Sequence, residues 1–112
     1  MSTIMVTGGG AGLGKAVVNA LQRDGHDVII YDRKRGQDVC NPMGPPPAGL
    51  DILINCAGVN ITGWLEDFSE ADWDQVMDVN AKGIFKMTQW ALPELAKTRG
   101  TVLNIVSNAS HM

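Results

Sequence analysis

The chain has 112 residues, of which 45% are hydrophobic and 19% are charged. This composition is typical of a globular protein and excludes an intrinsically disordered chain. The formal net charge of −3 argues against a surface for nucleic acid or an anionic membrane, and no apolar run approaches the roughly 20 residues that span a bilayer. The amino-terminal sequence has no secretory pattern, and Cys40 and Cys56 lack the spacing of metal ligands. We therefore expect a cytoplasmic protein with reduced thiols and no metal site.

Short apolar runs predict the strands of a sheet. The runs are continuous rather than alternating, as expected where both faces of a strand are covered. In chain order, the predicted strands are 3–7, 27–32, 51–58 and 101–106, the last of them buried. The segment from Gly36 to Gly49 holds four of the five prolines, so it cannot form an ordinary helix, and at most residues 37–40 add a short strand.

Apolar residues at helical spacing predict two helices between these strands. The first begins near Leu13 and ends before Gly25, and the second is one long helix between Ser69, its predicted N-cap, and Gly100. Strands that alternate with helices favour a parallel sheet with right-handed crossovers. The long helix is apolar nearly all round and needs cover on more than one side, so we expect a homo-oligomer that associates through residues 72–97.

The stretch "VTGGGAGLGKA" lies between the first strand and the first helix. Glycines in this place allow backbone amides to approach a pyrophosphate at the positive end of the helix. The spacing is TGxxxGxG rather than GxGxxG, and Lys15 does not complete a Walker A loop. A glycine-rich turn can also be purely structural. The candidate cofactor-binding residues of this turn are Thr7, Gly8, Gly10, Ala11, Gly12, Leu13 and Gly14.

Asp32 strengthens the prediction of a dinucleotide site. It ends the second predicted strand, where a carboxylate can accept both ribose hydroxyls of the adenosine half and repel a 2′-phosphate. This favours NAD over NADP. Arg33, Lys34 and Arg35 argue mildly for NADP, because an arginine here can pair with that phosphate; they can also be an exposed basic loop.

Three further features complete a pattern: "NCAG" at Asn55–Gly58, Asn80 in "DVNAKGIF", and Ser107 after the last strand. Together with the TGxxxGxG turn, they make the chain resemble the short-chain dehydrogenase/reductase family along essentially its whole length. The resemblance implies the N-terminal half of a doubly wound α/β Rossmann fold with strand order 3-2-1-4-5, so that residues 1–112 form a dinucleotide-binding domain. It also implies hydride transfer between a nicotinamide cofactor and a small carbonyl or alcohol substrate.

The resemblance assigns roles to individual residues. Asn55, Ala57 and Gly58 would line the cofactor ribose and stabilise the sheet, and Asp38 and Val39 would flank the adenine. Asn80 would match the catalytic asparagine that positions a water for proton relay. Ser107 would match the catalytic serine, which bonds the reacting oxygen. Without the resemblance, the two catalytic candidates could instead bond nearby backbone or cap a loop.

The family's catalytic tyrosine and lysine follow the serine, whereas this sequence ends at Met112 and has one tyrosine, Tyr31. We therefore expect a chain interrupted just after the serine strand, inactive alone even where it binds cofactor. Two alternatives stay open, a non-catalytic NAD-binding module and an inactive structural fragment. The substrate cannot be read from these residues.

Overall fold

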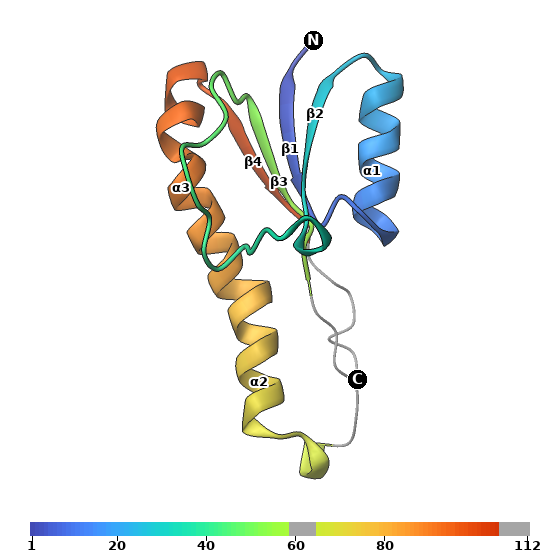
Figure 1. Cartoon of the computed structure of the whole chain (residues 1–112), viewed down its shortest axis with the longest axis vertical. Helices are drawn as coiled ribbons and strands as arrows, with labels where there is room; N and C mark the ends of the chain where they lie inside the picture. The colour runs from blue at the N-terminus through green and yellow to red at the C-terminus, as the bar shows by residue number, and fades with distance from the viewer. Residues whose placement is uncertain (59–64, 106–112) are drawn as a thin grey trace.

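The computed structural model describes residues 1–58 and 65–105, which form an α/β fold built on one parallel sheet (Figure 1). All three strand pairs in this sheet are parallel, and the spatial order is β2-β1-β3-β4. The strands are β1 (Thr3–Thr7), β2 (Asp27–Tyr31), β3 (Ile52–Asn55) and β4 (Thr101–Asn104). The Rossmann-type α/β architecture expected from the sequence is therefore confirmed.

The predicted short strand at residues 37–40 is absent, and this part of the prediction is wrong. Without it, the order 3-2-1-4-5 loses its first member, and β2 becomes an edge of the described sheet. Residues 37–40 turn instead, because the Asp38 carboxylate accepts a hydrogen bond from the Cys40 amide at 2.9 Å. The Asp38 carbonyl also accepts from the Tyr31 hydroxyl at 2.6 Å. These bonds use the polar groups locally and leave the proline-rich segment irregular.

Helices cover both faces of the sheet (Figure 1). Helix α1 (Gly12–Arg23) packs on one face, where Val18 joins Ile4, Val6 and Ile54 in a buried cluster. Helix α3 (Gly83–Thr98) packs on the other face. Its cluster comprises Met5, Tyr31, Leu50, Leu53, Met87, Ala91 and Leu95. The side chains of β1 point alternately to the two clusters, which explains why its apolar run is continuous.

The predicted long helix is one continuous right-handed run with a local widening. It comprises α2 (Glu70–Met77), the π-helical turn η3 (Asp78–Lys82) and α3. Ser69 is the N-cap as predicted, since its hydroxyl accepts from the Asp72 amide at 3.0 Å. At the other end the C-cap is Arg99, which adopts the left-handed conformation with φ of 55°, one residue before the predicted stop at Gly100.

The last strand differs from its prediction. Strand β4 ends at Asn104 rather than residue 106, and most of its residues are exposed, Leu103 among them at 51%. It lies at the edge of the described sheet and is paired on one side with β3. An apolar run of this length fits an edge strand as well as a buried one, because burial depends on neighbours rather than on the strand itself.

The proline-rich segment is held against the molecule by aromatic side chains. Tyr31 and Trp90 lie with ring centroids 6.1 Å apart. Tyr31 donates to the Asp38 carbonyl as described above, and Trp90 Nε1 donates to the Gly44 carbonyl at 2.8 Å. The segment thus runs along α3 in place of a crossover helix. No helix in the described part of the chain has the length and apolar content to cross a membrane.

Candidate nucleotide-binding site

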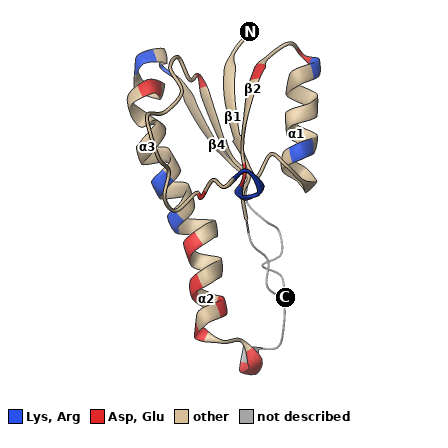
Figure 2. Ribbon diagram, in the orientation of Figure 1, with Lys and Arg blue, Asp and Glu red and all other residues tan. Residues whose placement is uncertain are grey.

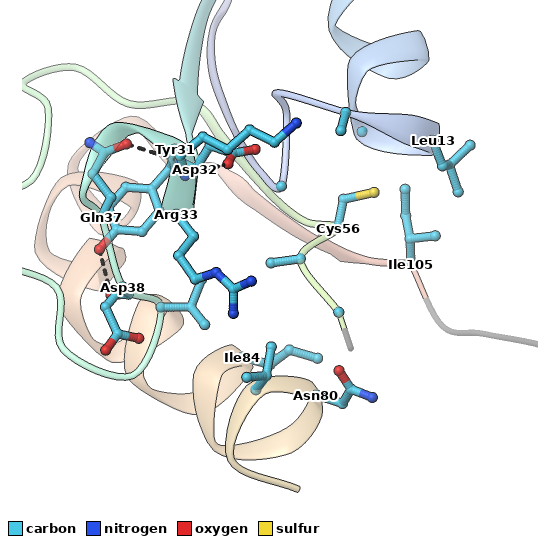
Figure 3. Close-up of a pocket in the computed structure, with 18 residues that line it drawn as sticks. Leu13, Tyr31, Asp32, Arg33, Gln37, Asp38, Cys56, Asn80, Ile84 and Ile105 are labelled. Carbon is cyan, nitrogen blue, oxygen red and sulfur yellow. Dashed lines mark hydrogen bonds between the residues drawn. The ribbon is translucent and has the colours of Figure 1, made fainter. Parts of the chain in front are cut away.

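A cavity of about 810 Å³ lies where the carboxyl ends of β1, β2 and β3 meet the start of α1 and the turn η3 (Figure 3). This is the position at which ligands bind in open parallel sheets. The volume is within the range of sites for small molecules and cofactors. Predicted site residues that line it are Gly8, Ala11, Leu13, Gly14, Asp32, Arg33, Asp38, Val39, Ala57, Gly58 and Asn80.

The glycine turn fits a pyrophosphate. A Cβ atom on Gly14 would collide with the carbonyl oxygen of Gly8, so the turn can fold this tightly only with glycine at that position. Ala11 is the N-cap of α1, and no side chain in the described ranges caps the first amides of this helix. Those amides and the helix dipole form an anion-binding end. The donors therefore suit the phosphates of a dinucleotide.

Thr7 joins the ends of β1 and β3 from behind the cavity. Its buried hydroxyl oxygen accepts hydrogen bonds from the amides of Cys56 at 2.9 Å and Ala57 at 3.0 Å. Both of those residues line the cavity. Thr7 itself does not line it, so it serves the site by fixing the chain after β3.

Asp32 lies at the carboxyl end of β2 and is only 8% exposed. Its Oδ1 accepts from the Lys34 amide at 2.8 Å, and its Oδ2 accepts from the Gly10 amide at 2.7 Å. These bonds, that of Lys34 foremost, hold the pKa of the carboxyl below its ordinary value. Each carboxylate oxygen has a further lone pair, so the group can still accept a ligand hydroxyl.

Basic and polar groups surround the same end of the cavity. The short helical turn η1 (Arg33–Arg35) follows Asp32 directly, and Figure 2 shows its basic residues at the end of β2. The Arg33 side chain extends across the cavity in Figure 3. Asp38 and Val39, predicted to flank an adenine, line this end too.

Asn80 reaches the cavity from the π-helical turn η3. A Cβ atom on Gly58 would lie 3.3 Å from Asn80 Oδ1, which brings the predicted catalytic asparagine beside the chain after β3. Cys56 lies nearby, and burial raises the pKa of its thiol, which disfavours the reactive thiolate.

Four predicted residues lie near the cavity without lining it: Thr7, Gly10, Gly12 and Asn55. Gly12 starts α1 with φ of 56°, and Gly10 lies beneath the Asp32 carboxylate. Asn55 is buried and links β3 to β4, because its Nδ2 donates to Asn104 Oδ1 at 2.9 Å. Ser107 lies outside the described residues.

The sequence reasoning missed several lining residues. They are Tyr31, Lys34, Gln37, Cys56, Val79, Ile84 and Ile105. Position at the carboxyl end of the last predicted strand could have indicated Ile105, and proximity to Asn80 could have indicated Val79 and Ile84. Gln37 had no such signal, because its role depends on the fold: its Oε1 accepts from the Asp32 amide at 2.9 Å. In the described ranges, no cluster of three or more His, Cys, Asp or Glu could hold a metal.

The fold and the cleft place the chain in the class of Rossmann-type nucleotide-binding folds, and comparison with known proteins identifies the family. The model of the short chain dehydrogenase family matches residues 46–112. An uncharacterized oxidoreductase from Staphylococcus aureus strain N315 is 30% identical over 131 residues, covering 92% of this chain and 57% of that protein. The chain belongs to the short-chain dehydrogenase/reductase family, whose members bind a nicotinamide cofactor.

Two solved structures share the fold. A protein named as a 2-deoxy-d-gluconate 3-dehydrogenase from Agrobacterium tumefaciens, with bound NADP, is 34% identical with a TM-score of 0.82, covering 99% of this chain and 55% of that one. The ligand-free aldohexose dehydrogenase of Thermoplasma acidophilum is 26% identical with a TM-score of 0.82, covering 95% and 49%. The chain thus spans about half the length of these relatives.

Replacing Thr7 with valine should destabilise the fold, because valine keeps the shape and removes the acceptor for two partly buried amides. An unsatisfied buried group costs about 1–3 kcal/mol, and these amides are partly buried, so we expect Thr7→Val to lower the free energy of unfolding by about 1–2 kcal/mol. Urea unfolding followed by circular dichroism measures this. Thr7→Ser, which keeps the hydroxyl, is the matched control and should cost clearly less. Equal losses in the two variants would show that the hydroxyl does not hold the strand ends together.

Proposed function

We propose that residues 1–112 form the cofactor-binding part of an oxidoreductase that transfers a hydride between a nicotinamide dinucleotide and a carbonyl or alcohol substrate. The observation that carries this proposal is the cleft between the uncapped start of α1 and the carboxylate of Asp32. The bound nicotinamide would donate or accept the hydride, and the protein would orient it. Both solved relatives are named as dehydrogenases, which is consistent with this class of reaction.

The cofactor we propose is NAD, with NADP bound more weakly. The carboxylate of Asp32 lies in the cavity and can accept hydroxyl groups of a ribose, whereas it repels a phosphate at the same place. Arg33 and Lys34 also line the cavity and act in the opposite sense. We give the carboxylate the greater weight because two backbone amides fix its position, whereas both basic residues are exposed. One solved relative has NADP bound, and the titration below therefore compares both cofactors.

We further propose roles for the reacting end. Asn80, presented by η3 beside Gly58, would position a water, and Ser107 would bond the reacting oxygen. The sequence contains one tyrosine, and its hydroxyl already donates to the Asp38 carbonyl, while burial raises its pKa. Tyr31 is therefore a poor general acid or base. We infer that these 112 residues bind the cofactor and do not turn over substrate unaided.

Calorimetric titration tests both parts of this proposal. The chain should bind NAD more tightly than NADP, and Asp32→Ala should remove most of the difference by weakening NAD binding. The same protein, given NAD and a panel of alcohols, should form no NADH.

Asp27→Ala is the matched control, because Asp27 is an exposed aspartate at the other end of the same strand. It should leave both affinities unchanged. Failure to bind either nucleotide would refute the proposed function, tighter NADP binding would refute the cofactor preference, and NADH formation would refute the expected inactivity.

We also propose that two copies of the chain associate through the long helix. Four large apolar side chains are exposed along it, namely Trp73 at 57%, Met77 at 41%, Phe85 at 60% and Leu92 at 55%. Met77 and Phe85 are eight residues apart, and the extra residue accommodated by the π-helical turn reduces this to two α-helical turns. The four side chains therefore share one side of the helix.

Charge along the helix favours a second copy as the partner. Acidic residues concentrate on α2 and lysines on η3 and α3 (Figure 2). If the twofold axis is perpendicular to the helices, the two copies run antiparallel, and the acidic half of one faces the basic half of the other.

Sedimentation velocity tests the self-association. The chain should sediment as a dimer or larger species, and Phe85→Glu should dissociate it, because burying two unpaired carboxylates is costly. Gln75→Glu adds the same charge at an exposed position two residues from Trp73, on another side of the helix, and should leave association intact. A monomeric wild-type chain would contradict the proposal.

A further inference from the structure

The carboxylate of Asp32 is held between two backbone segments. Gly10 belongs to the turn after β1, and Lys34 belongs to the turn after β2, and each donates its amide to a different oxygen. Hydrogen bonds to an ionised acceptor are short and strong, and these measure 2.7 and 2.8 Å. The carboxylate therefore has one fixed position relative to the glycine turn.

The backbone of Asp32 is fixed as well. Its amide donates to Gln37 Oε1 at 2.9 Å. Its carbonyl accepts from the amides of Arg35 at 2.9 Å and Gln37 at 3.3 Å. The part of this residue that can yield to a new neighbour is its side chain.

Gly10 leaves room for the carboxylate because it has no side chain. A Cβ atom there would lie 2.6 Å from Asp32 Oδ2 and 2.9 Å from its Cγ. Both separations are below 3.0 Å, and non-bonded contacts of a Cβ atom this short essentially never occur in proteins. Gly10 does not line the cavity, so an alanine there would act on the ligand through the displaced carboxylate.

We propose that Gly10 is a specificity-determining position, which sets NAD against NADP by holding the Asp32 carboxylate in place. This rests on the proposed function. With alanine at position 10, the carboxylate would rotate away from the turn and lose its bond to the Gly10 amide. Its hydrogen bond with a ribose hydroxyl would weaken, and so would its repulsion of a 2′-phosphate. Arg33 and Lys34, which line the same end of the cavity, would then favour NADP.

A double-mutant cycle on cofactor binding tests this proposal. The dissociation constants of NADH and NADPH are measured by fluorescence for the wild-type chain, Gly10→Ala, Asp32→Ala and the double variant. We expect Gly10→Ala to lower the preference for NADH by about tenfold, the effect of losing one hydrogen bond to a charged group. In the Asp32→Ala background, where the new Cβ has space, the same substitution should change the preference little.

Gly58→Ala is the control, because it adds a methyl group elsewhere on the cavity wall, near Asn80. It can weaken both nucleotides together but should leave their ratio unchanged. An unchanged ratio in Gly10→Ala, or an equal change in both backgrounds, would overturn the proposal.

A second measurement does not require any variant to fold or any nucleotide to bind. In the wild-type chain, the amide chemical shifts of Gly10 and Lys34 should both follow the titration of Asp32, below its ordinary pKa of about 3.9. A Gly10 amide that is insensitive to this titration would show that the bond to the carboxylate is absent, and would refute the proposal. Failure of the wild-type chain to bind NADH or NADPH would instead refute the proposed function.

Discussion

The ends of three parallel strands can form a binding cleft only if the backbone groups that leave the sheet find partners. The hydroxyl of Thr7 satisfies two such amides after β3. The amide of Gly8 donates to the Tyr31 carbonyl at 2.8 Å and ties the same turn to β2. Asp32 then reaches back to Gly10. The glycine turn is therefore fastened to both neighbouring strands, and the start of α1, the candidate phosphate site and the carboxylate all depend on this.

Features set by local chemistry could be predicted from the sequence. Residues 3–7 are followed by glycines that allow a tight turn into a helix, and the strand and helix lie where the pattern placed them. Ser69 caps its helix because its short side chain lets the hydroxyl accept a hydrogen bond from a free amide of the first turn, that of Asp72. The family resemblance added Asn80 and the chain after β3, which no local pattern places in the cleft.

Features set by distant contacts could not be predicted. The sequence predicted that Asp32 would bind a ribose, but the hydrogen bonds of its carboxylate to the Gly10 and Lys34 amides arise only when two turns meet. Gln37 likewise joins the site only in the folded chain, where its Oε1 accepts a hydrogen bond from the Asp32 amide. Residues 101–106 were expected to form a buried strand, yet the segments that cover a strand are decided by the rest of the fold. Residues 37–40 were considered for a strand. They form a turn instead, because Asp38 makes hydrogen bonds with Tyr31 and Cys40.

The long helix contains a feature that was not predicted from the sequence, the π-helical turn η3. From ideal helix geometry, a regular α-helix would turn Phe85 and Leu92 away from Trp73 and Met77, and the extra residue of the π-helical turn would bring them back to one side. The same turn presents Asn80 to the cleft. One widened turn therefore serves both the candidate site and the proposed contact between copies, and π-helical turns are frequent at functional sites.

Amide hydrogen exchange with and without NAD tests most directly whether the cleft at the strand ends is the cofactor site. Read by mass spectrometry, exchange should slow on addition of NAD in peptides spanning 8–14, 32–39 and 55–58, and stay unchanged in α2 at 70–77. Slowing confined to other segments, or none at saturating NAD, would contradict this account of the cleft.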